Sequence, residues 1–164
     1  MPFQSKAKAQ LHERIEEEEK NFLLWSMSHE ETSEFFITQT FIDGVQPNKE
    51  KPLRDYMLTF LLNLTNNVGK EVYGIGGSWD SHQDNAHLQP WEKRRQSHFH
   101  LMVSVPLILP SSVVMRLGNQ GRDGRKLPRW GRHTCDVYDS DRGGFPYILT
   151  RHMWEKFQVF HPRK

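Results

Sequence analysis

The chain has a single cysteine, Cys135, among its 164 residues. One thiol excludes internal disulfides and zinc sites built from several thiolates, because each of these needs at least two cysteines. Scarcity of cysteine is also typical of proteins from a reducing compartment, so a cytoplasmic location is expected.

Long hydrophobic runs are also lacking. The longest apolar stretch, residues 99–109, is interrupted by polar residues and proline and is too short to span a bilayer. The N-terminus has no apolar segment typical of a secretory signal. The sequence therefore predicts a soluble chain with no membrane partner.

Net charge is small, at +2, so the chain is no global polycation. The charge is nevertheless unevenly distributed, with four consecutive glutamates at 16–19 and a basic, glycine-rich stretch at 118–132. The candidate nucleic-acid-binding residues of this stretch are Arg122, Arg125, Lys126 and Arg129. A local basic patch suits a phosphate backbone, and equally a solvated loop kept soluble by arginine.

Hydrophobic periodicity and turn signals predict one α+β domain over residues 1–164. The expected elements are helices over 7–25, from 52 to the turn at 66–69, over 113–117 (capped by Ser111 or Ser112) and from 146 to about 157, and strands over 34–45, 71–82, 97–105 and 134–139. This βαββαβ order, with an extra N-terminal helix, predicts a ferredoxin-like or RRM-like antiparallel sheet. Its helices would cover one face and leave the other open.

The strand at 97–105, with the sequence SHFHLMVSV, carries the first candidate site. Alternate residues from Phe99 to Val105 are apolar, so they would face a core. His98 and His100 then share the opposite face, about 6–7 Å apart by strand rise. Two imidazoles so placed can bind one divalent cation, although an isolated His-x-His also occurs by accident on surfaces and in cores.

Three other histidine-rich sites fit this strand less well. A histidine-triad hydrolase needs a third histidine where Met102 stands. A cupin needs glutamate four or five residues after His100, at positions occupied by Ser104 and Val105. Zinc deaminases need paired cysteines, which a chain with one cysteine cannot supply.

The last predicted helix carries the second candidate group. Tyr147 falls in its first turn, and Arg151, four residues later, lies on the same side. Leu149, Met153 and Phe157 would form the apolar stripe on the other side. The helix would therefore present a phenol and a guanidinium away from its own core, unless Tyr147 is an ordinary residue at the edge of the apolar face.

Together these segments resemble the HUH endonucleases, the nicking domains of rolling-circle replication initiators, single-strand transposases and conjugative relaxases. The resemblance lies in the strand at 36–41 (FITQTF), the His-hydrophobic-His strand, and the helical tyrosine that follows a β-turn. Order and spacing are most similar to the replication initiators, including the segment 137–139 and Gly144 ahead of the tyrosine. The resemblance covers about residues 34–157.

The resemblance implies a function. His98 and His100 would bind Mg²⁺ or Mn²⁺ against the scissile phosphate of single-stranded DNA at an origin or hairpin, where the ion polarises the phosphoryl oxygen. Tyr147 would attack phosphorus and leave a 5′-phosphotyrosine and a free 3′-OH, which allows later rejoining. Arg151 or the metal would favour the phenolate, since a free phenol has a pKa of about 10. Rolling-circle replication of a plasmid or virus would start from this nick.

The resemblance further implies a third metal ligand on the neighbouring strand. The expected alternation turns Tyr73, Ile75 and Trp79 toward the core and Ser78, Asp80 and His82 toward the open face. Asp80 is the first choice and His82 the second, and a bulge at 76–77 would reverse this alternation.

The chain departs from the family in two respects. Many initiators carry lysine three residues after the tyrosine, where this chain has Thr150. Residues 118–126 lack the Gly-Lys-Ser/Thr ending of a phosphate loop, so the stretch is interpreted as a DNA-contacting loop and a host helicase as a partner. A small transposase with the same chemistry, and a non-catalytic nucleic-acid-binding module that stacks bases on the open sheet face, remain alternatives.

Overall fold

A computed structural model describes residues 2–41, 53–79, 98–120, 130–151, 153–155 and 159–162. Its elements are α1 (Pro2–Met27), β1 (Ser33–Phe41), α2 (Leu53–Val68), β2 (Val72–Trp79), β3 (His98–Val105), α4 (Ser111–Asn119), β4 (Trp130–Val137), the 3-10 turn η1 (Ser140–Arg142), α5 (Gly144–Arg151), β5 (Met153–Glu155) and β6 (Val159–Phe160). This order confirms the predicted α+β fold with its N-terminal helix.

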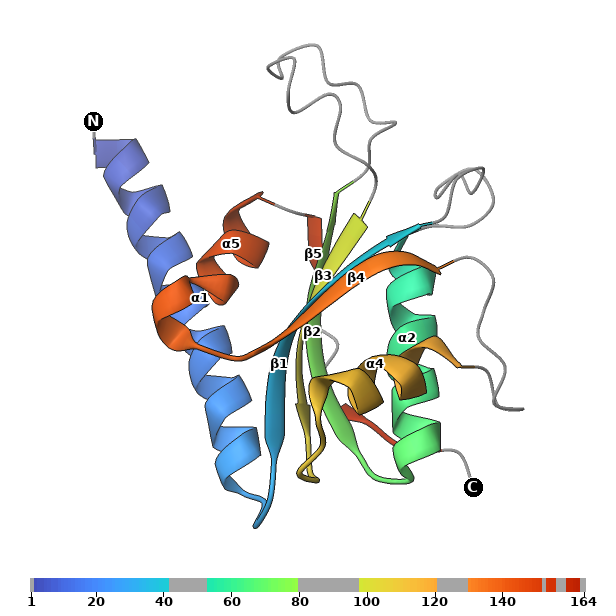
Figure 1. The fold of residues 1–164 in the computed structure, drawn as a ribbon. Coiled ribbons are helices and arrows are strands. Elements are labelled where there is room, and N and C mark those ends of the chain that lie inside the picture. Colours follow the sequence, from blue (N-terminus) through green and yellow to red (C-terminus); the bar gives the residue numbers. More distant parts are fainter. Residues whose placement is uncertain are drawn as a thin grey trace.

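The strands form one antiparallel sheet in the order β4-β1-β3-β2-β5, and β6 also pairs with β2 (Figure 1). The histidine strand β3 is therefore central and is hydrogen-bonded to β1 on one side and to β2 on the other. A central strand has both edges paired, so its side chains are held in fixed register with those of its neighbours.

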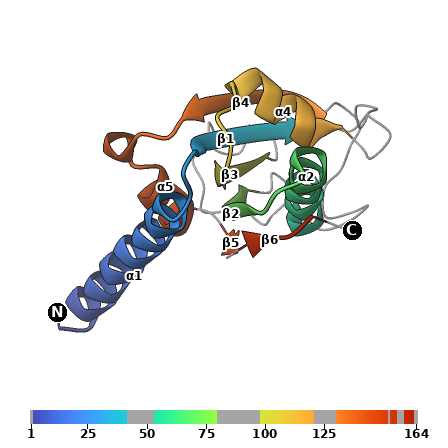
Figure 2. The ribbon, with the colours of Figure 1, turned by 90° about the horizontal axis from the view of Figure 1, so that it is seen from below.

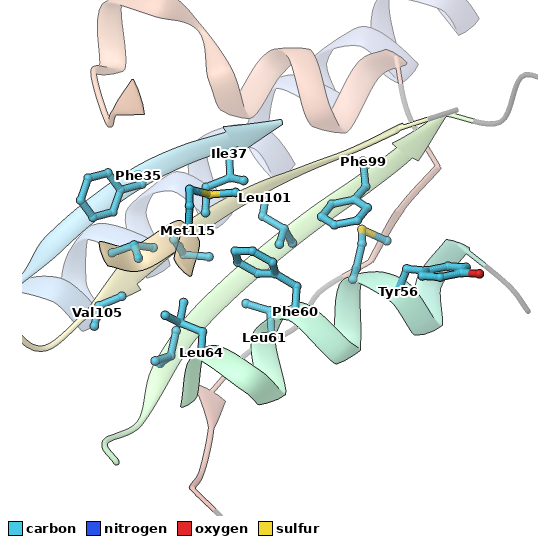
Figure 3. Packing of buried hydrophobic residues seen from close by; sticks show 14 residues of the cluster. Phe35, Ile37, Tyr56, Phe60, Leu61, Leu64, Phe99, Leu101, Val105 and Met115 are labelled. Carbon is cyan, nitrogen blue, oxygen red and sulfur yellow. The ribbon is translucent and has the colours of Figure 1, made fainter. Parts of the chain in front are cut away.

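Helices α2 and α4 cover one face of the sheet, as predicted (Figure 2). The helix predicted from residue 52 is confirmed as α2, and its Tyr56, Phe60 and Leu64, spaced four residues apart, are all buried. The strands contribute the predicted alternate residues of β3, among them Phe99 and Leu101 (Figure 3). Helix α2 ends at Val68 and is followed by Gly69, whose φ of 74° is one that few other residues adopt.

The opposite face is not open, contrary to the prediction. Helices α1 and α5 lie on it side by side (Figure 2). Phe22 of α1 is fully buried there, with ring centroids 5.8 Å from Tyr73 and 5.3 Å from Phe145 of α5. Tyr73 and Met102 give this face apolar side chains of its own, and the two helices remove them from water.

The last helix is shorter than predicted. Helix α5 ends at Arg151, and β5 then pairs antiparallel with the edge of β2, with Trp154 opposite Gly77. Pairing this edge satisfies backbone groups that a longer helix would have left unpaired. Residues 156–158, the end of the expected helix, lie outside the described residues.

Two helix boundaries also differ from the prediction. Helix α1 begins at Pro2, and α4 begins at Ser111 after an N-cap Pro110 that makes no side-chain hydrogen bond, so the predicted serine cap is wrong. None of the helices in the part of the chain described here is long and apolar enough to cross a membrane.

Candidate active site

His98 and His100 lie at the start of β3 on the face covered by α1 and α5. Both are buried, with 8% and 6% of their surface exposed, and their ring centroids are 4.9 Å apart at an interplanar angle of 77°. Two imidazoles whose nitrogens each lie about 2.1 Å from one ion would have centroids about 4.6–5.3 Å apart. The observed separation therefore suits joint binding of one cation.

Strand β1 holds the ring of His100 from two directions. Thr38 is directly opposite His100 in the β1–β3 register, and its Oγ1 is 2.8 Å from the ring Nδ1. Phe36 stacks on the same imidazole, with centroids 5.2 Å apart and planes 24° from parallel. When Nδ1–H donates to the threonine hydroxyl, the lone pair is on Nε2, the nitrogen then available to a metal.

Tyr147 comes to the histidines from α5. It is partly exposed, its backbone N–H donates to the carbonyl of Gly143 (3.0 Å), and its ring meets that of His100 edge-on with centroids 5.2 Å apart. The structure thus places side by side the phenol and the imidazole that the sequence singled out separately.

The other tyrosines of the chain are poorly suited to nucleophilic attack. Burial raises the pKa of Tyr56, and it raises the pKa of Tyr73 and of Tyr138 to about 12, with charge on Glu18 or Glu19 adding to the effect. A higher pKa leaves less phenolate at neutral pH. Tyr138 packs edge-on against Phe22 (5.4 Å between centroids) and has a structural role.

The alternation expected for β2 is wrong. Tyr73 and Ile75 pack with Met102 on the histidine face, and β2 pairs with β3 without a bulge, so that Gly77 is opposite His100 and Trp79 is opposite His98. The glycine leaves no side chain beside His100 on this strand. The sequence of this glycine-rich strand does not show which of its faces meets the histidines, because both sets of alternate residues include small or apolar members.

Several predicted site residues lie outside the described residues: Asp80, His82, Arg122, Arg125, Lys126 and Arg129. Arg151 ends α5 one turn after Tyr147, with its side chain outside the described set as well. Within the described ranges, no three histidine, cysteine, aspartate or glutamate side chains gather as a metal site. The described centre therefore consists of two imidazoles, one phenol and the groups that hold them.

A pocket of about 430 Å³ opens beside His100 and Tyr147, and sequence reasoning missed it. Its wall includes Phe36, Asp136 and Arg142. Sequence reasoning also missed Thr38. The alternation of β1 offered a signal, because alternate residues of that strand, Thr38 among them, share the face that carries the histidines. A larger hollow of about 540 Å³, lined by His29 and Glu71 among others, touches neither His100 nor Tyr147.

Comparison of the chain with models of protein families, with curated proteins and with solved structures found no match in any of the three.

Proposed function

We propose that the chain is a metal-dependent, single-tyrosine endonuclease and strand transferase of the HUH type, acting on single-stranded DNA to start rolling-circle replication of a plasmid or virus. The observation that carries the proposal is the contact between the rings of Tyr147 and His100, 5.2 Å between centroids. This contact brings the phenol, the proposed nucleophile, beside the two imidazoles. These imidazoles would together hold the cation that binds the phosphate.

The histidine pair suits a divalent cation, Mg²⁺ or Mn²⁺. The centroid separation of 4.9 Å suits one shared ion, and the contact of Thr38 with Nδ1 of His100 favours Nε2 as the binding atom of that ring. When bound, the cation supplies positive charge to the phosphoryl oxygens as negative charge develops on them. His98 and His100 hold it in place, and their burial limits the competition from water.

Tyr147 carries the covalent step. Its Oη attacks phosphorus, the bond from phosphorus to the 3′-oxygen breaks, and the products are a 5′-phosphotyrosine and a 3′-OH that takes up a proton. The phenol proton is released to solvent, because the Tyr147 side chain is partly exposed to water. Only about one free phenol in a thousand is ionised at neutral pH, so a nearby positive charge accelerates the step.

Further residues belong to the proposal through their place in the chain. The resemblance implies an acidic third ligand on this strand, and Asp80, which directly follows Trp79, stays the first choice. Because Trp79 is opposite His98, this role requires the chain to leave the regular alternation of β2 after Trp79. Arg151 lies one helical turn after Tyr147 and would favour the phenolate. The remaining residues, proposed as contacts to the DNA backbone, are Arg122, Arg125, Lys126 and Arg129. A host helicase would open the duplex.

The test is formation of a covalent adduct. The protein is incubated with Mn²⁺ and labelled single-stranded oligonucleotides carrying origin hairpins, and SDS-stable protein–DNA species are measured. We expect an adduct that requires metal, is prevented by a chelator and is lost in Tyr147→Phe. Tyr138→Phe is the matched control, because it removes a phenol on the same face and should leave the adduct.

Three outcomes would contradict parts of the proposal. An adduct that persists in Tyr147→Phe removes Tyr147 as the nucleophile. An adduct undiminished by a chelator removes the metal role of His98 and His100. Binding to many oligonucleotides without any adduct indicates a non-catalytic binding module. If the adduct forms, the DNA that flanks the gene distinguishes replication from transposition. An origin hairpin there favours replication, and terminal element repeats favour transposition by the same chemistry.

A further inference from the structure

The pocket beside the candidate centre joins two chemically different ends. One end is formed by His100 and Tyr147. The other is formed by the end of β4 and by η1, which bring in Asp136 and Arg142. The lining also includes apolar side chains, with Met102 among them, that belong to the core under α1 and α5. Its volume of about 430 Å³ lies within the range of about 300–1,000 Å³ typical of small-molecule sites.

The β4–α5 connection shapes the polar end. Asp139 begins η1 and accepts a hydrogen bond from the backbone N–H of Asp141 (3.0 Å). Gly143 ends the turn with a φ of 70° and turns the chain back toward the pocket. Asp139 also lines the pocket, but one of its carboxylate oxygens holds the turn, so the exposed carboxylate of Asp136 is the better placed to bind a ligand with both oxygens.

The register of the sheet places Asp136 on the same face as the histidines. Asp136 is opposite Phe36 in the β1–β4 pair, and Phe36 is opposite Met102 in the β1–β3 pair. Phe36 also stacks on His100. Phe36 therefore lies between the strand that carries Asp136 and the strand that carries His100. A ligand that reaches both must extend past this ring, as a nucleotide does with its phosphate at one end and its base at the other.

We propose that this pocket binds the nucleobase next to the scissile phosphate, and that Asp136 selects a base with an amino group on its pairing edge. The inference rests on the proposed function, which puts the phosphate at His100 and Tyr147. It adds a specificity-determining residue and a class of ligand, a nucleoside monophosphate unit, that the nicking chemistry alone does not require.

The four bases differ in how they match a carboxylate and a guanidinium. Guanine offers N1–H and N2–H to the Asp136 carboxylate and its O6 and N7 acceptors to Arg142. Cytosine and adenine offer one amino group. Thymine places carbonyl oxygens on both sides of N3–H, which repel a carboxylate. We therefore expect guanine to bind best and thymine worst in a single strand, where the pairing edge is exposed.

The pocket can be tested without turnover. The ¹⁵N-labelled protein is titrated with each of the four deoxynucleoside 5′-monophosphates, and the amide signals of Gly143 and Gly144 are followed by NMR. We expect these signals to move, with half-saturation at least about fivefold lower for the guanine nucleotide than for the thymine nucleotide. Asp136→Asn should reduce that preference to less than twofold, whereas Asp141→Asn, in η1 next to Arg142, should leave it unchanged.

A second arm uses the covalent adduct. Oligonucleotides that differ only in the base on either side of the nick, including an abasic site, are compared for the rate of adduct formation. We expect one of the two positions to show the same base order and to lose at least tenfold in rate when abasic.

The two arms separate failure of the pocket from failure of the proposed function. An adduct that forms at equal rates with every flanking base, together with unmoved Gly143 and Gly144 signals, overturns the pocket and leaves the endonuclease standing. Base-selective movement of those signals without any adduct supports the pocket and overturns the endonuclease. An unchanged preference in Asp136→Asn overturns the role of Asp136.

Discussion

The hydroxyl oxygen of Thr38 lies 2.8 Å from Nδ1 of His100, across the pairing of β1 with β3. This contact fixes which imidazole nitrogen is turned toward the candidate metal position and limits rotation of the ring. The group that performs this positioning comes from the strand beside the histidines, where the fixed register of a central sheet holds it.

Replacing Thr38 by valine should weaken metal binding. Valine keeps the shape of the side chain and removes the hydroxyl, so the tautomer and orientation of His100 are no longer held. Loss of such a supporting hydrogen bond typically costs about 10–100-fold in metal affinity. The measurement is the Mn²⁺ concentration that gives half-maximal adduct formation, with direct Mn²⁺ binding by EPR.

Thr40→Val is the matched control for this prediction. Thr40 is on the same strand face, opposite His98, but its hydroxyl donates to the carbonyl of Arg132 (2.9 Å). We expect Thr40→Val to leave the Mn²⁺ requirement within about twofold. Equal weakening by the two substitutions would show that Thr38 acts through general stability of β1 and not through His100.

The protein should use Mn²⁺ at lower concentrations than Mg²⁺. The proposed ligands that the structure describes are imidazole nitrogens. Mg²⁺ prefers oxygen ligands and retains its water, whereas nitrogen affinity rises from Mn²⁺ onward along the first-row series. Adduct formation titrated with each ion should give a half-maximal concentration at least about tenfold lower for Mn²⁺. Equal values for the two ions would argue for a site dominated by carboxylates.

Gly118→Ala should destabilise the fold without altering the site. A Cβ at position 118 of α4 would overlap the ring of Phe60 on α2. Overpacking of this kind costs about 1–3 kcal/mol. Urea unfolding followed by circular dichroism measures the loss, and the folded variant should form adduct at the normal rate, since position 118 is on the face away from the histidines.

Arg116→Ala serves as the control for Gly118→Ala. Arg116 is an exposed residue of the same helix, so its removal should change the free energy of unfolding by no more than about 0.5 kcal/mol. Wild-type stability of Gly118→Ala would mean that α2 and α4 lie farther apart than described.

Stability should fall at alkaline pH. Burial raises the pKa of Tyr73 and of Tyr138 from 10.0 to about 12, and that of Cys135 from 9.0 to about 12. The unfolded chain therefore loses these protons at lower pH than the folded chain. The contribution of these protonated side chains to the free energy of unfolding is full below about pH 9. It is lost progressively as the pH rises toward 12.

The urea midpoint measured between pH 8 and 12 checks this prediction. Tyr73→Phe should flatten the decline, because it removes one of the groups that ionises earlier in the unfolded chain. A midpoint that stays constant up to pH 11 would show that these side chains are more accessible to water than their burial indicates.

The sequence by itself determined the parts of the fold that depend on local periodicity. Hydrophobic periodicity predicted α2, in which Tyr56, Phe60 and Leu64 are buried, and the alternation along β3 placed His98 and His100 on one face together. Both patterns repeat with the period of their own element, so neighbours in sequence suffice to define them.

Only the tertiary structure decided how those elements combine. The register between β2 and β3 places Gly77, and not an acidic residue, opposite His100. Helices α1 and α5 cover the face that had been expected to be open. The contacts of His100 with Thr38 and Tyr147 join residues far apart in the chain. Pairing register and the choice of face depend on long-range packing, which local patterns do not encode, and that packing turned two histidines on a strand into a candidate reaction centre.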